Sequence, residues 1–238
     1  MARSHDLPHR LQRRLALHQA LHDPACEPRN RLPRLAELRR WQAGRLERSF
    51  GDFLADPRSA PAARFFLSEV YGDRDFSRRD ADIARVLPMM ERLLPTSLLE
   101  TVADAIALGA LTHAFDLRMA DALQADRGPL DAERYARAYR QVGHPRLRMR
   151  QIDLVRDVGH GLGAALRMPG LRMLLRLSRG PAHATGFSEL QGFLERGVDA
   201  FARLGDATRF IEEIERGERE IARRLFAGDP AAFGPMPR

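Results

Sequence analysis

Residues 97–119, SLLETVADAIALGALTHAFDLRM, form the most apolar helical pattern in the chain. Apolar side chains follow one stripe at three- and four-residue spacing, and a second stripe covers the other side of the same helix. A helix that is apolar nearly all round belongs in the interior of a fold, so we predict a central helix near 97–123. Ser97 and Glu100 have the spacing of a capping box at its start. The first stripe contains Leu99, Val102, Ile106, Ala110, His113 and Leu117, and the second contains Leu108, Leu111 and Phe115.

Helical periodicity continues through almost the whole chain, and no segment alternates convincingly as a strand would. We therefore predict an all-α fold, a single multi-helix domain of about eight to ten helices that spans residues 1–238. Residues 1–30 are a candidate peripheral arm, and residues 228–238 form an irregular tail that packs Phe226 or Phe233 back onto the body. Besides the central helix, the expected helical segments are 11–21, 35–54, 65–70, 83–94, 130–142, 149–166, 171–179, 190–201 and 210–225.

All of the basic side chains are arginines, because the chain has 39 basic residues and no lysine. Residues 1–48 hold 11 arginines against 5 acids and residues 144–179 hold 8 against 2, whereas the rest of the chain holds 20 against 25. If the two basic segments share an exposed face, they form a surface for an acidic protein or a phosphate-bearing ligand. Alternatively, they neutralise the acidic remainder within the fold.

The only cysteine, Cys26, lies between two prolines on an expected loop, which excludes an intramolecular disulfide and fits a reducing compartment. The longest apolar run, residues 105–111, is far shorter than the roughly 20 residues that a membrane-spanning helix needs. The N-terminus has no apolar core of signal-peptide length. We therefore expect a cytoplasmic protein without a transmembrane segment.

Motifs that would identify common enzyme classes are absent from the sequence. It has no phosphate-binding G-x-x-x-x-G-K-[ST], no strand-borne G-x-G-x-x-G, no H-E-x-x-H and no G-x-S-x-G. The Glu-x-x-His pattern of ferritin-like di-iron bundles is also missing. A single cysteine excludes a cysteine-rich zinc or iron–sulfur site.

The best constellation for chemistry is DLVRDVGHGLG, residues 153–163. Asp153, Asp157 and His160 fall on one helical face, where they could bind a hard divalent cation or carry out acid–base chemistry. The alternative is an ordinary polar surface opposite an apolar face. On that interpretation Gly159 and Gly163 let another helix approach closely.

Histidines offer two further candidates. His113 interrupts the apolar stripe of the central helix, where a buried imidazole could ligate haem iron or a metal, or sense pH. Alternatively, it is a core residue with hydrogen bonds to its neighbours. His18 and His22 have the i, i+4 spacing of a metal-ligand pair. Beside so many arginines, however, we expect both of them on a solvated face.

A short basic helix is the candidate for binding an anion. Arg172, Arg176 and Arg179 repeat at i, i+4 and i+7 opposite leucines. This pattern suits phosphate, an acidic protein or an anionic membrane face, or else pairing with acids of the same chain. Without a helix-turn-helix motif or aromatic side chains for base stacking, it does not indicate specific DNA recognition.

The stretch RFFLSEVYGDRDFSRRDAD, residues 64–82, places aromatic side chains in front of alternating Asp and Arg. Gly72 stands where a helix C-cap glycine belongs, so we interpret the stretch as a corner between two helices rather than as an active site. Adjacent phenylalanines lie about 100° apart on a helix and should reach two different contacts, at least one of them in the core. The residues expected to build this corner are Phe65, Phe66, Tyr71, Phe76, Arg78, Arg79 and Asp80.

The stretch ARFFLSEVYGDRDFSRRDADIARVLPMMERLLP and the ending RFIEEIERGEREIARRLFAGDPAAF together resemble a group of uncharacterised helical proteins from proteobacteria. The resemblance covers most of the chain. It implies an all-helical bacterial protein, and it assigns no catalytic residue to any position.

Two hypotheses about function remain from the sequence. The first is a non-catalytic cytosolic binding or scaffold protein that engages an anionic partner through its arginine-rich faces. The alternative is a helical metal- or haem-dependent enzyme that uses Asp153, Asp157 and His160, or His113. The enzyme requires several of these side chains to converge on one concave pocket, whereas the binding protein does not.

Overall fold

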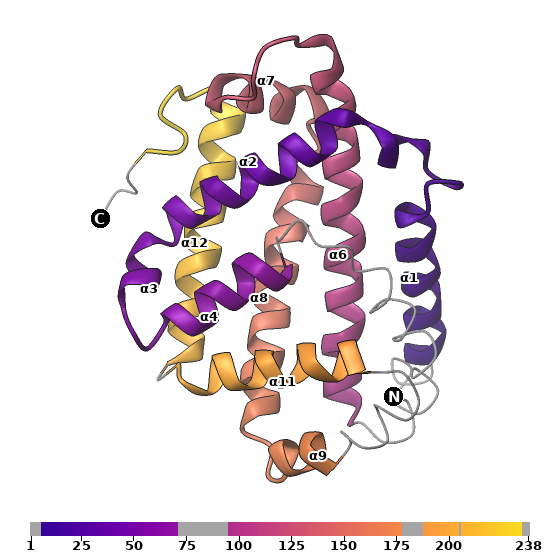
Figure 1. The fold of residues 1–238 in the computed structure, drawn as a ribbon, viewed down its shortest axis with the longest axis vertical. Coiled ribbons are helices and arrows are strands. Elements are labelled where there is room, and N and C mark those ends of the chain that lie inside the picture. The colour runs from indigo at the N-terminus through magenta and orange to yellow at the C-terminus, as the bar shows by residue number, and fades with distance from the viewer. Residues whose placement is uncertain (1–5, 71–94, 178–187, 205, 235–238) are drawn as a thin grey trace.

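The chain is helical throughout the part that the structure describes (Figure 1). The structure, a computed structural model, describes residues 6–70, 95–177, 188–204 and 206–234. These ranges contain ten α-helices and no strand, which confirms the predicted all-α class. The extent of a single domain over residues 1–238 stays a prediction.

The predicted central helix is α6 (Thr96–Ala122), which is in contact with four other helices. They are α1 (Leu7–His22), α2 (Pro33–Ser49), α7 (Ala132–Val142) and α8 (Pro145–Leu166). Figure 1 shows α6 between α1 on one side and α8 on the other, with α2 crossing in front. α6 is therefore apolar nearly all round because it packs against other helices on several sides.

Three hydrophobic clusters meet along α6, and each receives side chains from it. Near its start, Leu99 and Ile106 pack with the buried leucines of α1. Leu108 points into a second cluster together with α8 and α12 (Ala207–Ala227). Leu117 belongs to a third cluster at the other end, which includes residues of α2, α7 and α12.

The remaining helices cover the outside of this arrangement. α12 packs along α8, and α11 (Ser188–Ala202) contacts α4, α8 and α9. Short 3-10 turns lie before α2 and after α6, and a π-helical turn follows α4. The bounds of these elements are η1 (Pro28–Arg31), α3 (Gly51–Ala55), α4 (Ala60–Phe65), η2 (Phe66–Val70), η3 (Leu123–Ala125) and α9 (Leu171–Leu177).

Two local expectations differ from the structure. The helix expected over residues 35–54 is two helices, because α2 ends at Phe50, which is buried in a non-helical conformation, and α3 starts at Gly51. The capping box of Ser97 and Glu100 does not form. α6 already begins at Thr96 after Pro95, so Ser97 lies inside the first turn and its carbonyl accepts the hydroxyl of Thr101 at 3.0 Å.

Both ends of the described chain pack onto the body. Residues 1–30, the candidate peripheral arm, contain α1, whose Leu7, Leu11 and Leu15 are buried against α6. At the other end, the ring of Phe233 lies 5.4 Å from that of Trp41 on α2, measured between centroids. The ring of Phe226 lies 5.0 Å from that of Tyr139. Both aromatic residues proposed as anchors of the tail thus make contacts.

Only the first part of the expected corner can be described. Phe65 and Phe66 are both buried, and each has a contact that the other lacks. The ring of Phe65 lies 5.4 Å from Phe193 of α11, and that of Phe66 lies 6.2 Å from Phe210 of α12. The other expected corner residues, Tyr71, Phe76, Arg78, Arg79 and Asp80, lie outside the described residues.

α6 and η3 together, Thr96–Ala125, form a helix that is long and apolar enough to cross a membrane by length and composition alone. Within the described ranges no other helix meets this test, and the core helix of a soluble protein meets it equally well. The absence of a transmembrane segment therefore stays a prediction from the sequence.

Glycines on α8 permit the close approach that the sequence suggested for Gly159. A Cβ atom at Gly159 would lie 2.7 Å from Cγ1 of Ile211 on α12. A Cβ atom at Gly161 would lie 2.6 Å from Cγ2 of Thr101 on α6. At Gly163 the nearest atom, Cβ of Ala207, is at an ordinary distance of 3.7 Å. Hence α8 is wedged between α6 and α12 at positions 159 and 161.

We predict opposite effects for Gly159→Ala and Gly217→Ala, both in helix interiors. Ile211 is fully buried and must shift to admit a methyl group at position 159, at a typical cost of about 1–3 kcal/mol. Gly217 on α12 has nothing within 4 Å of its Cβ position, so alanine there should gain up to about 1 kcal/mol of helix propensity. Thermal unfolding followed by circular dichroism should show a lower Tm for Gly159→Ala and a higher Tm for Gly217→Ala. Equal shifts would contradict the tight contact between α8 and α12.

Candidate functional site

Three histidines from two helices come together where the end of α1 meets α6. The ring centroids of His22 and His113 are 3.9 Å apart with the rings stacked at 17°, and those of His18 and His22 are 4.2 Å apart. Gly109, one turn before His113, makes room for this arrangement, since its Cβ position lies 3.0 Å from Cε1 of His18. We call His18, His22 and His113 the histidine cluster.

His113 is held by hydrogen bonds at both ring nitrogens. Its Nε2 faces the carbonyl oxygen of Leu21 at 3.1 Å and Oδ1 of Asn30 at 2.8 Å. Its Nδ1 lies 2.8 Å from Nη2 of Arg39, which can only donate. The neutral tautomer with the proton on Nε2 satisfies all three contacts.

Burial keeps His113 neutral. Only 3% of its surface is exposed, and desolvation lowers its pKa from 6.5 to about 3, with further lowering by nearby His22 and Arg39. Asn30 fixes the geometry, because its side-chain amide donates to the carbonyls of Leu21 and Glu27 at 2.9 Å each. His113 therefore has the contacts of a core histidine, one of the two roles considered from the sequence.

A buried carboxylate one turn further along α6 extends the polar contacts of this helix. Asp116 accepts a hydrogen bond from Gln42 at 3.2 Å, and its Oδ2 lies 3.8 Å from Nε of Arg39. Burial raises the pKa of Asp116, while the charges of Arg39 and Arg148 and the Gln42 hydrogen bond oppose the rise. Arg39 thus bridges His113 and Asp116 and ties α2 to α6.

Arg148 is a buried arginine that lies between two aromatic rings. The carbon of its guanidinium is 3.6 Å from the ring centroid of Phe115 and 4.3 Å from that of Tyr139. Its Nη2 also donates to the sulfur of Met119 at 3.2 Å. Cation–π attraction of this kind is stronger at desolvated positions than at exposed ones. The arginine-rich segment 144–179 therefore contributes at least one arginine to the interior rather than to a surface.

The carboxylates of the candidate polar face on α8 are occupied by arginines. Asp153 pairs with Arg219 of α12, and Asp157 pairs with Arg156 at 2.8 Å and with Arg150 at 3.6 Å. His160 is exposed. Asp153, Asp157 and His160 all lie on α8, but the two carboxylates are half-buried and face cations that a metal ion would have to displace.

Metal coordination finds no support in the described residues. No group of three or more His, Cys, Asp or Glu side chains within them is placed to hold a metal ion. The rings of His22 and His113 are stacked, and stacked rings do not direct their nitrogens at a common point, whereas the ring of His18 is tilted by 40° against that of His22. His18 is buried and His22 half-buried, which contradicts the expectation that the pair lies on a solvated face.

The three arginines expected to bind an anion are only partly described. Arg176 on α9 is exposed, Arg179 lies outside the described residues, and the position of the Arg172 side chain is not described. On the same helix, Met173 and Leu177 expose 66% of their surface each. The structure thus places a charged side chain beside two exposed apolar ones at this end of the fold.

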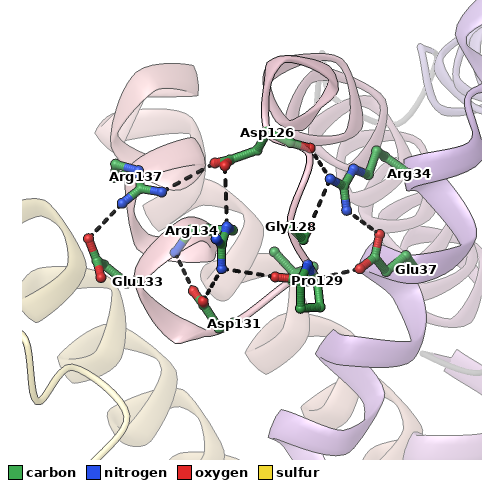
Figure 2. A network of polar contacts seen from close by, with 10 residues as sticks. Arg34, Glu37, Asp126, Gly128, Pro129, Asp131, Glu133, Arg134 and Arg137 are labelled. Atoms are coloured by element: carbon green, nitrogen blue, oxygen red, sulfur yellow. Dashed lines mark hydrogen bonds and ion pairs between the residues drawn. The ribbon is translucent and has the colours of Figure 1, made fainter.

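Polar contacts from α2 and α7 hold the loop that follows η3 (Figure 2). Arg34 on α2 donates to the carbonyls of Asp126 and Gly128, and Glu37 accepts the backbone N–H of Leu130 at 2.8 Å. Within the loop and α7, ion pairs join Asp126, Asp131, Glu133, Arg134 and Arg137. These arginines are engaged by carboxylates or carbonyls of the same chain, and Arg34 is the one among them that belongs to a basic segment, residues 1–48.

Sequence reasoning did not find Asn30, Arg39, Gln42, Asp116 or Arg148 as parts of the polar interior. The position of Asp116 in the sequence did indicate a buried polar contact, because a carboxylate within an apolar helical stretch needs a partner. The other four positions gave no such indication, since only the packing of α2 and α8 on α6 brings them to the buried groups.

A family model described as a domain of unknown function, DUF8198, matches residues 21–232. No curated protein and no solved structure matches the chain. The matched range includes His22, Asn30, Arg39 and His113, whereas His18 lies just before it.

We predict a pH dependence of stability that comes from His113. Its folded pKa of about 3 lies below the unfolded value of 6.5, so the unfolded state binds more protons between these two pH values. Stability should therefore fall as pH falls through this window, by up to about 1.4 kcal/mol per pH unit from this one group. Chemical denaturation of the wild type and His113→Gln at pH 7.5, 6 and 5 measures the effect. The variant should show the shallower dependence, and equal slopes would contradict the role of His113.

Proposed function

We propose, on the premise that the chain belongs to the DUF8198 family, that it is a cytosolic, non-catalytic binding protein whose α9–α11 end receives an acidic, amphipathic segment of a partner protein. The observation that carries the proposal is the exposure of Met173 and Leu177, one turn apart on α9, beside the exposed Arg176.

Large exposed apolar side chains gather at this end of the described chain. Five such residues are exposed within the described ranges, and three of them lie on α9 and α11. Leu194 of α11 is 39% exposed, and Gln191 of α11 donates to the carbonyl of Leu175 on α9 at 2.6 Å. Figure 1 shows α9 at the extremity of the fold, next to α11. Clustered apolar side chains with polar neighbours are typical of interaction sites, and methionine adapts easily to different partners.

Charge favours an acidic partner over a second copy of the chain. Arg176 lies three residues after Met173, so its guanidinium flanks the apolar pair. Arg167 just before α9 is exposed as well. A net charge of +7 makes two copies repel at long range and attracts an acidic segment.

The placement of the other candidate groups supports a binding protein more than an enzyme. Asp153 and Asp157 contact arginines of α12 and α8, whereas His113 is enclosed by α1, η1 and α2. These groups belong to different contacts, and an enzyme would need them around one pocket.

We predict that removing the apolar pair or reversing the charge weakens binding of an acidic amphipathic peptide. The probe is a synthetic helix with leucines at i and i+4 and flanking glutamates, and its affinity is measured by fluorescence anisotropy at low and high salt. Met173→Ser/Leu177→Ser and Arg176→Glu should each lose at least about tenfold in affinity relative to the wild type, and salt should weaken wild-type binding.

Leu17→Ser is the matched control, because Leu17 is 57% exposed on α1 and lies outside this end. It should bind like the wild type. Surface substitutions of this kind usually change stability by less than about 0.5 kcal/mol, so unfolding should not confuse the result. Equal affinities for all variants would contradict the proposal. Binding of the wild type to vesicles of anionic phospholipid but not to the peptide would also contradict it.

A further inference from the structure

We infer that the histidine cluster is a pH-sensitive latch that holds α1 on α6 near neutral pH and releases α1 when the medium becomes acidic. The inference does not rest on the proposed function, because α9 and α11 take no part in the cluster.

Among the described residues, α1 is attached through one side. Its strong contacts are with α6, and Figure 1 shows it on the flank of the fold, away from α12. Leu7, Leu11 and Leu15 form the apolar part of this attachment, together with one ion pair between Arg14 and Asp104 at 2.8 Å. The histidine cluster closes the C-terminal end of the same interface, so α1 can separate without disturbing the packing of α8 and α12.

In the closed fold, Arg39 of α2 leaves no room for a second proton on His113. The second proton of an imidazolium would sit on Nδ1, where the N–H of Arg39 already points at 2.8 Å. That proton would replace an acceptor with a donor and place two cations in contact. The parallel ring of His22 at 3.9 Å covers one face of His113, so that face becomes accessible to water when α1 moves.

Three of the carboxylates around the cluster, Glu27, Asp104 and Asp116, have arginine or amide partners of their own. From the segment after α1, Glu27 binds Arg29 at 2.7 Å, and Asp23 is exposed. From α6, Asp104 binds Arg14, and the negative charge of Asp121 helps to raise the pKa of Arg29. Asp116, also on α6, faces Gln42 and Arg39 of α2. The three contacts of His113 are with Arg39, Asn30 and a backbone carbonyl, so a new positive charge on its ring would have no anion in hydrogen-bond contact.

Opening α1 therefore couples to proton uptake. In the open state the imidazole of His113 is in water and accepts a proton below about pH 6.5, whereas the closed state keeps His113 neutral down to a pKa of about 3. The opening equilibrium shifts by as much as tenfold per pH unit for His113 alone. The released surfaces are the leucine face of α1 and the apolar start of α6.

Hydrogen–deuterium exchange of the full chain at pH 7.5 and pH 5, corrected for the intrinsic exchange rates, tests the latch. The exchange of peptides from α1 is compared with that of peptides from α12, which contains no histidine. We expect the protection of α1 to fall about tenfold or more at pH 5 and that of α12 to fall less. A fall of equal size in both helices, or none in α1, would overturn the inference.

Variants separate the histidines from other acid effects. His22→Gln/His113→Gln should lose most of the pH dependence of α1 protection, even if its protection at pH 7.5 is lower. His9→Gln, at an exposed position on the same helix, should keep the wild-type dependence. If the double variant fails to fold, His22→Gln alone should show a reduced dependence. If the cluster variants keep the full pH dependence of α1 protection, the latch is overturned. It is also overturned if Asp104→Asn alone removes this pH dependence, because the effect then belongs to the Arg14–Asp104 pair.

Discussion

Burial of α6 on several sides is the constraint on which the rest of the structure depends. Leu99, Leu108 and Leu117 point into three separate clusters, so α1, α8 and α7 with α2 must all be in place before this helix is out of water. The same burial removes the polar side chains of α6 from water. His113 and Asp116 need partners inside the fold, and Arg39 of α2 meets both. Apolar packing thus places the helices, and the few buried polar contacts determine their register.

The periodicity of apolar residues predicted most of the helices because each helix buries a stripe of its own sequence. Where a helix stops depended on contacts that periodicity does not contain. Phe50 continues the buried stripe of Leu46, yet its backbone leaves the helical conformation and divides the helix expected over residues 35–54. Ser97 fitted a local capping pattern, yet Pro95 starts α6 one residue earlier. Local patterns therefore predicted the presence of helices better than their ends.

The histidine cluster shows why the site was harder to predict than the fold. His18 and His22 were recognisable as a pair one turn apart, and His113 was recognisable as polar within an apolar stripe. Their meeting depends on how α1 lies against α6, in which Gly109 leaves the space that His18 fills. The arginines were ambiguous for the same reason. Arg148 between two aromatic rings and Arg176 at the surface look alike in sequence, and only the tertiary fold distinguishes them.

The contacts between α2 and the last part of the chain have a consequence for biosynthesis. Arg45 pairs with Glu218, and Trp41 packs on Phe233, so the packing of α2 is completed only by residues far downstream in the chain. Such distant pairings raise the contact order and slow folding. During translation the apolar side of α2 remains exposed to water until nearly two hundred further residues have been added. A nascent chain of this kind is a natural client for chaperones that shield unfinished helices.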